Sequence, residues 1–129
     1  TNRGEWLAEM KTDSGTAKVA GIELTLLDCA SWFHRAGGIS AVGTIARDLG
    51  GKALARRLTA LAGAYEGTAV RRLGYLLELA RHEEQAKALE RFGQKARAMK
   101  LLDPSSSDEL GEMSGRWKIV VNRPVKREP

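Results

Sequence analysis

Hydrophobic side chains recur every three or four positions in five successive segments between residues 22 and 99. This spacing places the apolar residues of each segment on one face of a helix. The first segment covers residues 22–34 and ends at Gly37-Gly38, and the second covers 39–49 and ends at Gly50-Gly51. Because glycine readily ends a helix and these connectors are short, the pattern predicts helices that pack as hairpins with their neighbours.

Three more helices are predicted further along the chain. One covers residues 54–65 and stops within the glycines at 63–67, and the next begins near Thr68, a residue type that caps helix N-termini. We expect this fourth helix to be the central one. The fifth apolar stripe covers 86–99, and the polar step His82-Glu83-Glu84 predicts a bend or break before it.

Strand patterns flank these helices at both ends of the chain. Residues 5–11 alternate in polarity and residues 17–20 form a short apolar run after a turn sequence, which predicts a strand pair. Residues 117–121 are β-branched and alternating, and the polar segment 105–115 before them is predicted to be a loop. The predicted fold class is therefore α+β, with a small antiparallel sheet, made of the two N-terminal strands and the C-terminal strand, packed on a bundle of four to five helices.

Length and composition limit the kind of protein. A chain of 129 residues has the size of one domain, so residues 1–129 are interpreted as a single domain. The chain starts without methionine and its ordered pattern begins already at Trp6, which indicates a fragment of a longer protein. The single Cys29 cannot form an internal disulfide, and no apolar run has the length of a membrane span or the form of a signal peptide. We therefore expect a cytoplasmic protein.

Positive charge is concentrated in the middle of the chain. The net charge is +5, and residues 47–100 contain 12 Lys and Arg against 6 Asp and Glu. A surface of this sign attracts polyanions such as nucleic acid, but it is equally compatible with a solvated helical face that binds none. Both interpretations stay open at this point.

The sequence offers no complete catalytic or metal-binding motif. His82-Glu83-Glu84-Gln85-Ala86 starts like a zinc-protease helix, but Ala86 stands where the second histidine is required. Gly50-Gly51-Lys52-Ala53 lacks the glycine spacing and the hydroxyl residue of a phosphate-binding loop, and is interpreted as a helix stop and restart. We therefore predict a binding protein rather than an enzyme, with no cofactor and no metal.

Asp28 and Cys29 lie within the first predicted helix. His34 is more than a turn away from Cys29, a poor arrangement for thiolate activation, so the cysteine is interpreted as a small buried side chain. Asp28 follows the apolar run 24–27, where a partly buried carboxylate needs a partner. We expect a structural hydrogen bond or ion pair there rather than a catalytic acid.

Segment 70–78 is the strongest candidate for a binding helix. When its valine and leucines face inward, Arg71, Tyr75 and Glu78 share the opposite face. Gly74 costs about 1 kcal/mol relative to alanine in a helix interior, so its presence indicates close approach by another backbone. The segment is interpreted either as a tightly packed helix with a solvated charged face or as part of a patch for phosphates. That patch would consist of Lys52, Arg56, Arg57, Arg71 and Arg72.

Five pieces of the sequence together carry a family resemblance. They are Glu23-Leu24-Thr25-Leu26-Leu27-Asp28, Gly37-Gly38, Arg71-Arg72-Leu73-Gly74-Tyr75-Leu76-Leu77-Glu78, Leu102-Asp103-Pro104 and Trp117-Lys118-Ile119-Val120-Val121-Asn122. Their order and approximate spacing resemble the C-terminal domain of AbiEi-type antitoxins, over nearly the whole chain. The residues taken as the structural motif are Glu23, Thr25, Asp28, Gly74, Tyr75, Glu78, Trp117 and Asn122.

The resemblance implies an antitoxin or transcriptional regulator of a bacterial type IV toxin–antitoxin system, of the abortive-infection kind. It implies an N-terminal winged helix-turn-helix domain, not contained in this sequence, that binds operator DNA. The present domain would assist DNA binding and autorepression and neutralise a nucleotidyltransferase toxin, by direct contact or through the toxin's modified target. No membrane and no small-molecule substrate is implied. The alternative is a protein-interaction or oligomerisation module without DNA contact, which an exposed apolar patch beside Tyr75 or Trp117 would favour.

Overall fold

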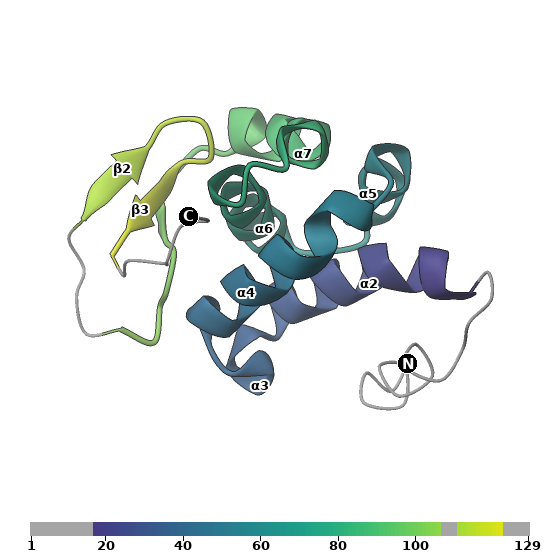
Figure 1. Cartoon of the computed structure of the whole chain (residues 1–129). Helices are drawn as coiled ribbons and strands as arrows, with labels where there is room; N and C mark the ends of the chain where they lie inside the picture. The colour runs from purple at the N-terminus through teal and green to yellow at the C-terminus, as the bar shows by residue number, and fades with distance from the viewer. Residues whose placement is uncertain (1–16, 107–110, 123–129) are drawn as a thin grey trace.

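The computed structural model describes residues 17–106 and 111–122, in which packed helices carry a small sheet at one end (Figure 1). The helical elements are α2 (Ala17–Ser31), α3 (Phe33–Ala36), α4 (Ile39–Leu49), η1 (Gly50–Lys52), α5 (Ala55–Ala62), α6 (Gly67–Leu79) and α7 (Glu83–Lys95). The strands are β1 (Lys100–Leu101), β2 (Glu112–Ser114) and β3 (Ile119–Val121). The α+β class is confirmed, whereas the arrangement of the sheet differs from the prediction.

α6 is the central helix, as expected. It packs against α2, α4, α7 and β3, and its side chains Val70, Leu73 and Leu77 are fully buried. Burial of each such side chain contributes about 1.5–3 kcal/mol relative to exposure. Arg71 and Gly74 on the same helix are also buried, so α6 is covered on more than its apolar side.

The helices end close to the glycines predicted to stop them, and the chain breaks at the predicted polar step His82-Glu83-Glu84. α4 ends at Leu49 and α5 ends just before Gly63, both near the predicted positions. Gly37 ends α3 with φ 107, a conformation that favours glycine. The chain breaks between α6 and α7 as predicted, and Arg81 adopts φ 66 at this break.

Two helix starts differ from the predictions. The strand predicted at 17–20 is wrong, because these residues form the first turn of α2. Four residues are too few to separate the strand period from the helix period. The strand predicted at 5–11 lies outside the described residues. α6 begins at Gly67 with Glu66 as its N-cap residue, so Thr68 lies inside the first turn rather than at the cap.

The sheet is mixed, with strand order β1-β3-β2. β3 pairs in parallel with β1 and antiparallel with β2, so that Val120 stands between Leu101 and Met113. The predicted antiparallel sheet is therefore wrong for the described residues, because β3 pairs with segments that follow α7. β2 lies within the segment predicted to be a loop, since a strand of three residues shows too little periodicity to be read.

The glycine pair after α4 lies where one helix ends and before the next begins, as predicted, and it also packs against other residues. A Cβ atom on Gly50 would lie 2.6 Å from the ring of His82 and from the side chain of Leu77, so a larger residue would require these side chains to move. Nε2 of His82 is 2.9 Å from the carbonyl oxygen of Arg47. These contacts hold the end of α4 against the break between α6 and α7.

Candidate functional site

The outer face of α6 is covered by the segment that leads into β3. Trp117 is fully buried there, and its indole lies so close to Gly74 that a Cβ atom would overlap the ring. The indole nitrogen donates a hydrogen bond of 2.7 Å to the carboxylate of Glu78. The close approach predicted at Gly74 is therefore made by a side chain rather than by a backbone. The face predicted to be solvated carries Trp117 instead.

Arg71 lies beneath the same segment and is 5% exposed. Its guanidinium donates to the backbone carbonyl oxygens of Trp117 at 2.9 Å, of Ala98 at 2.8 Å, and of Lys118. Burial lowers the pKa of Arg71, although a guanidinium stays charged in proteins. The placement contradicts Arg71 as a phosphate contact, because its donors hold the C-terminal segment instead of facing solvent.

Arg72 connects β1 to the helices. Its Nε donates a hydrogen bond of 3.0 Å to the carbonyl oxygen of Leu101, and its guanidinium lies 5.7 Å from the centre of the Phe33 ring. Desolvation by burial lowers the pKa of Arg72, and the negative charge of Glu66 acts in the opposite direction. This half-buried guanidinium is therefore partly engaged inside the domain, which limits its use as a phosphate contact.

Arg57 lies next to the buried carboxylate of Glu23, a residue of α2. Glu23 is fully buried, and one of its oxygens accepts a hydrogen bond of 2.7 Å from the backbone nitrogen of Leu54, the N-cap residue of α5. The other oxygen lies 3.6 Å from Nε of Arg57. Since α5 has no side-chain cap of its own, Glu23 serves as its N-terminal cap from a neighbouring helix. The Arg57 side chain remains 43% exposed.

Lys52 and Arg56 are the two predicted phosphate contacts that are exposed. Lys52 ends η1, and Arg56 lies in the first turn of α5. Within the described part of the chain, no carboxylate forms an ion pair with either of them.

α7 lies beside α5 and adds cations that sequence reasoning missed (Figure 1). The hydroxyl of Thr59 donates to the carbonyl oxygen of Ala88 at 3.2 Å, and Arg91 donates to the carbonyl oxygen of Thr59 at 3.3 Å. Lys87, Arg91 and Lys95 are exposed and recur every fourth residue, a spacing that places them on one side of a helix. This spacing is the signal in the sequence that predicts them. We call the exposed cations Lys52, Arg56, Lys87, Arg91 and Lys95 the α5–α7 face.

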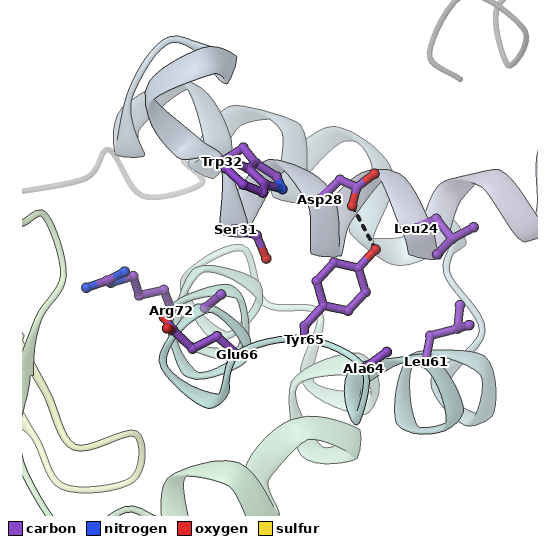
Figure 2. Close-up of a pocket in the computed structure, with 10 residues that line it drawn as sticks. Leu24, Asp28, Ser31, Trp32, Leu61, Ala64, Tyr65, Glu66 and Arg72 are labelled. Carbon is purple, nitrogen blue, oxygen red and sulfur yellow. Dashed lines mark hydrogen bonds between the residues drawn. The ribbon is translucent and has the colours of Figure 1, made fainter. Parts of the chain in front are cut away.

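A cleft of about 590 Å³ lies between α2 and the connection from α5 to α6 (Figure 2). Asp28 lines it, and the hydroxyl of Tyr65 donates a hydrogen bond of 2.7 Å to Oδ1 of this carboxylate. Asp28 therefore has the structural hydrogen bond that the sequence predicts. Neither His34 nor His82 lines the cleft.

Cys29 is a buried side chain, as the sequence predicts. Burial raises the pKa of Cys29 to about 11, and the charge of Asp28 adds to this rise. A thiol with such a pKa stays protonated at neutral pH and is a poor nucleophile.

Across residues 17–106 and 111–122, no three His, Cys, Asp or Glu side chains are placed to hold a metal ion. In the same residues, every helix is too short or too polar to cross a membrane.

Comparison with known families decides where this chain belongs. The family model described as AbiEi antitoxin C-terminal domain matches residues 5–79, which is more than half of the chain. The chain is a member of the AbiEi antitoxin family. No curated protein and no solved structure matches it.

The AbiEi match covers α2 to α6, and the motif residues within it make internal contacts. The hydroxyl of Thr25 donates a hydrogen bond of 2.7 Å to the carbonyl oxygen of Gly21. That bond lies within α2, whereas the contacts of Glu23, Asp28 and Gly74 given above join one helix to another element. These positions therefore build the AbiEi fold rather than an exposed binding surface.

Two motif residues of this AbiEi domain lie beyond the matched range, in the segment that packs on α6. Trp117 fills the space above Gly74, and Asn122 joins the ends of β1 and β3. Oδ1 of Asn122 accepts from the backbone nitrogen of Asp103 at 2.9 Å, and its Nδ2 donates to the carbonyl oxygen of Asp103 at 2.8 Å. The resemblance at these two positions stays a prediction, and in the structure Trp117 packs on α6 while Asn122 joins the ends of two strands.

Arg116 fastens the C-terminal segment of the AbiEi domain to α6 and α7. Its guanidinium forms ion pairs with Glu83 at 2.6 Å, Glu90 at 3.2 Å and Glu78 at 3.5 Å. It also lies 5.1 Å from the centre of the Trp117 ring. The hydrogen bond from Arg116 is the main reason why the pKa of Glu83 lies below its ordinary value.

Glu83→Gln is expected to remove a small stabilising contribution that depends on pH. Because the pKa of Glu83 is lower in the folded state, its contribution is present above the unfolded-state pKa and is lost as the pH falls through the folded-state pKa. The effect is small and salt-sensitive because Glu83 is exposed. Urea unfolding between about pH 7 and about pH 3 should show wild type and variant converging at the acid end. Glu84→Gln is the matched control without this ion pair, and a Glu83→Gln difference that is constant with pH would contradict the expectation.

Proposed function

We propose that this domain neutralises a nucleotidyltransferase toxin and helps an upstream winged-helix domain to repress its own operon by contacting DNA phosphates. The family match supports the antitoxin or regulator role. The α5–α7 face, with its exposed cations on η1, α5 and α7, is the observation that supports DNA contact. Such contacts add affinity without choosing a sequence, which suits a domain attached to a DNA-reading module.

The structure changes which cations this proposal uses. Arg71 is excluded by its burial, and Arg57 and Arg72 offer only the parts not engaged inside the domain. The three exposed cations of α7 follow one another at four-residue intervals, so their Cα atoms are spaced by about 6 Å along the helix. The exposed carboxylate of Glu84 lies one turn before Lys87, and it lowers the positive charge of that end of α7.

Arg56→Gln with Lys87→Gln is expected to weaken DNA binding and to flatten its salt dependence. Each lost phosphate contact lowers the slope of log affinity against log salt by about 0.9, so the double variant should lose about 1.8. Fluorescence anisotropy of the 129-residue chain with duplex DNA over a range of salt concentrations measures both quantities.

A matched control removes the same charge from another part of the molecule. Arg35 on α3 and Lys100 on β1 are exposed, and α3 and the sheet lie away from α5 in Figure 1. Arg35→Gln with Lys100→Gln should leave the slope close to that of wild type. If both double variants lose the same amount of slope, the effect comes from net charge rather than from the α5–α7 face. If Arg56→Gln with Lys87→Gln leaves the slope unchanged, the α5–α7 face does not contact DNA.

Toxin neutralisation is tested separately by growth. Co-expression of this domain with a nucleotidyltransferase toxin of an AbiEi-type system is expected to restore growth, because the resemblance assigns antitoxicity to the C-terminal domain. The double variant Arg56→Gln with Lys87→Gln should restore growth as well as wild type, since it alters only the proposed DNA contact. No restoration by the wild-type domain would refute the antitoxicity part of the proposal.

The alternative of an interaction module without DNA contact has weaker support. Trp117 is fully buried and offers no exposed anchor. Beside Tyr75, Met113 is 70% exposed and the two residues line a hollow of about 180 Å³. Isolated exposed hydrophobic residues are normal on protein surfaces, so the α5–α7 face remains the better supported binding surface.

A further inference from the structure

Arg57 on α5 has a guanidinium whose inner nitrogen is buried while its outer end is exposed. Nε of Arg57 is buried and forms no hydrogen bond, yet the side chain as a whole is 43% exposed. Its terminal nitrogens Nη1 and Nη2 form no hydrogen bond with a described residue and, unlike Nε, are not buried. Arg57 therefore presents the outer edge of its guanidinium to a ligand.

The buried nitrogen of Arg57 faces the carboxylate of Glu23. Oε1 of Glu23 lies 3.6 Å from this nitrogen and is likewise buried without a hydrogen bond. Oε2 accepts a hydrogen bond of 2.7 Å from the backbone nitrogen of Leu54, which fixes the carboxylate relative to the first turn of α5. The helix that carries Glu23, α2, packs against α5 (Figure 1). Glu23 thus holds a negative charge at a fixed place beside Arg57.

The negative charge of Glu23 is more than the start of α5 requires. The neutral amide oxygen of a glutamine could accept the same hydrogen bond from Leu54. A buried carboxylate, by contrast, costs free energy unless a cation compensates it, and Arg57 supplies that cation. The ion pair ties the inner end of the Arg57 guanidinium to the core, so the outer end has less conformational freedom than that of a fully exposed arginine.

We propose that Glu23 is a positioning residue that orients Arg57 to bind a DNA backbone phosphate through both terminal nitrogens. The ion pair holds Nε inward, and Nη1 and Nη2 then form two parallel hydrogen bonds with the phosphate. A side chain that is already held loses less conformational freedom on binding. The inference rests on the proposed DNA contact and adds an oriented arginine to the exposed cations of the α5–α7 face.

Two members of the α5–α7 face lie close to Arg57 in the chain. Arg56 precedes it in the first turn of α5, and Lys52 ends η1 shortly before that helix. Lys52 and Arg56 form no ion pair with a described carboxylate, whereas Arg57 does. Arg56 is therefore the comparison that separates an oriented arginine from an unoriented one on the same turn.

The first test compares Arg57→Lys with Arg56→Lys by fluorescence anisotropy of the 129-residue chain with duplex DNA at low salt. Both variants keep the positive charge, so neither changes the general attraction to DNA. Arg57→Lys loses the oriented pair of donors and should raise the Kd about fivefold more than Arg56→Lys does. Equal effects of the two variants would overturn the proposal and leave the proposed DNA contact intact.

Glu23→Gln tests the positioning role through the sign of its effect. The variant keeps an acceptor for Leu54 but removes a negative charge beside the cations, so a purely electrostatic effect would strengthen DNA binding. The positioning role predicts the opposite, a Kd about threefold higher. Glu84→Gln removes an exposed carboxylate from α7 and is the matched control, for which we expect the same or a lower Kd.

The double variant Glu23→Gln with Arg57→Lys completes the experiment. It should bind DNA no more weakly than Arg57→Lys alone, because Glu23 acts through Arg57. Urea unfolding verifies that each variant is folded under the binding conditions, and the comparison of Arg57→Lys with Arg56→Lys decides if Glu23→Gln does not fold. A Kd of folded Glu23→Gln at or below that of wild type overturns the proposal. Absence of DNA binding by the wild-type chain would refute the proposed DNA contact itself, and this inference with it.

Discussion

Trp117→Ala is expected to lower the free energy of unfolding by about 3–5 kcal/mol. The indole is fully buried against Gly74, and its nitrogen donates to Glu78. Its loss opens a cavity above α6 and weakens the attachment of β3 to the helices. Because small domains have a total stability of about 5–15 kcal/mol, the loss is a large fraction of the whole. Urea unfolding followed by circular dichroism measures it.

Trp32→Ala is the matched control for this prediction. Trp32 is 37% exposed and connects α2 to α3, whereas Trp117 is buried against α6. Its truncation should change the free energy of unfolding by less than about 1 kcal/mol. A loss below about 1 kcal/mol for Trp117→Ala, or equal losses for both variants, would contradict the role given to Trp117.

Arg71→Met is expected to lower the free energy of unfolding by about 3 kcal/mol, because it leaves backbone carbonyl oxygens without their donors. These carbonyls belong to Ala98 and Trp117, whereas the carbonyl of Lys118 keeps its hydrogen bond from the backbone nitrogen of Lys100. The variant therefore weakens the contact of the segments before β1 and before β3 with α6. Arg71→Lys keeps a charge but fewer donors, and should give an intermediate loss. Thermal or urea unfolding provides the measurement.

Arg71 and Arg56 should show opposite behaviour in stability and in DNA binding. Arg56 is exposed, so Arg56→Met should leave the free energy of unfolding within about 0.5 kcal/mol of wild type and should flatten the salt dependence of DNA binding. Arg71→Met or Arg71→Lys, measured where the protein is folded, should leave that salt dependence unchanged. A flattened salt dependence for the folded Arg71 variants would restore Arg71 as a phosphate contact.

The helices could be predicted from the sequence because their signals are local. Apolar residues at three- and four-residue intervals and glycine pairs such as Gly50-Gly51 fix where each helix runs and ends. The sheet gave no comparable signal. β1 and β2 contain two and three residues, so their partners are set by the position of α7 and by contacts such as that of Asn122 with Asp103.

The candidate site was harder to predict because burial depends on residues distant in the chain. The periodicity of α6 identifies the side that faces the helical core, but it does not show that Trp117, 46 residues after Arg71, covers the other side. The sequence therefore favoured Arg71 as an exposed cation. It missed Lys87 and Arg91 because only the packing of α7 against α5 brings these two helices together, with Arg91 at the carbonyl oxygen of Thr59.

The proposed DNA contact is located most directly by titrating the isotope-labelled 129-residue chain with a short duplex DNA at low salt and following each backbone amide by NMR. The α5–α7 face predicts shifts that concentrate on α5 and α7 and decrease as salt is added. Shifts that concentrate on α3 and the sheet, or no shifts even at low salt, would contradict DNA contact through the α5–α7 face.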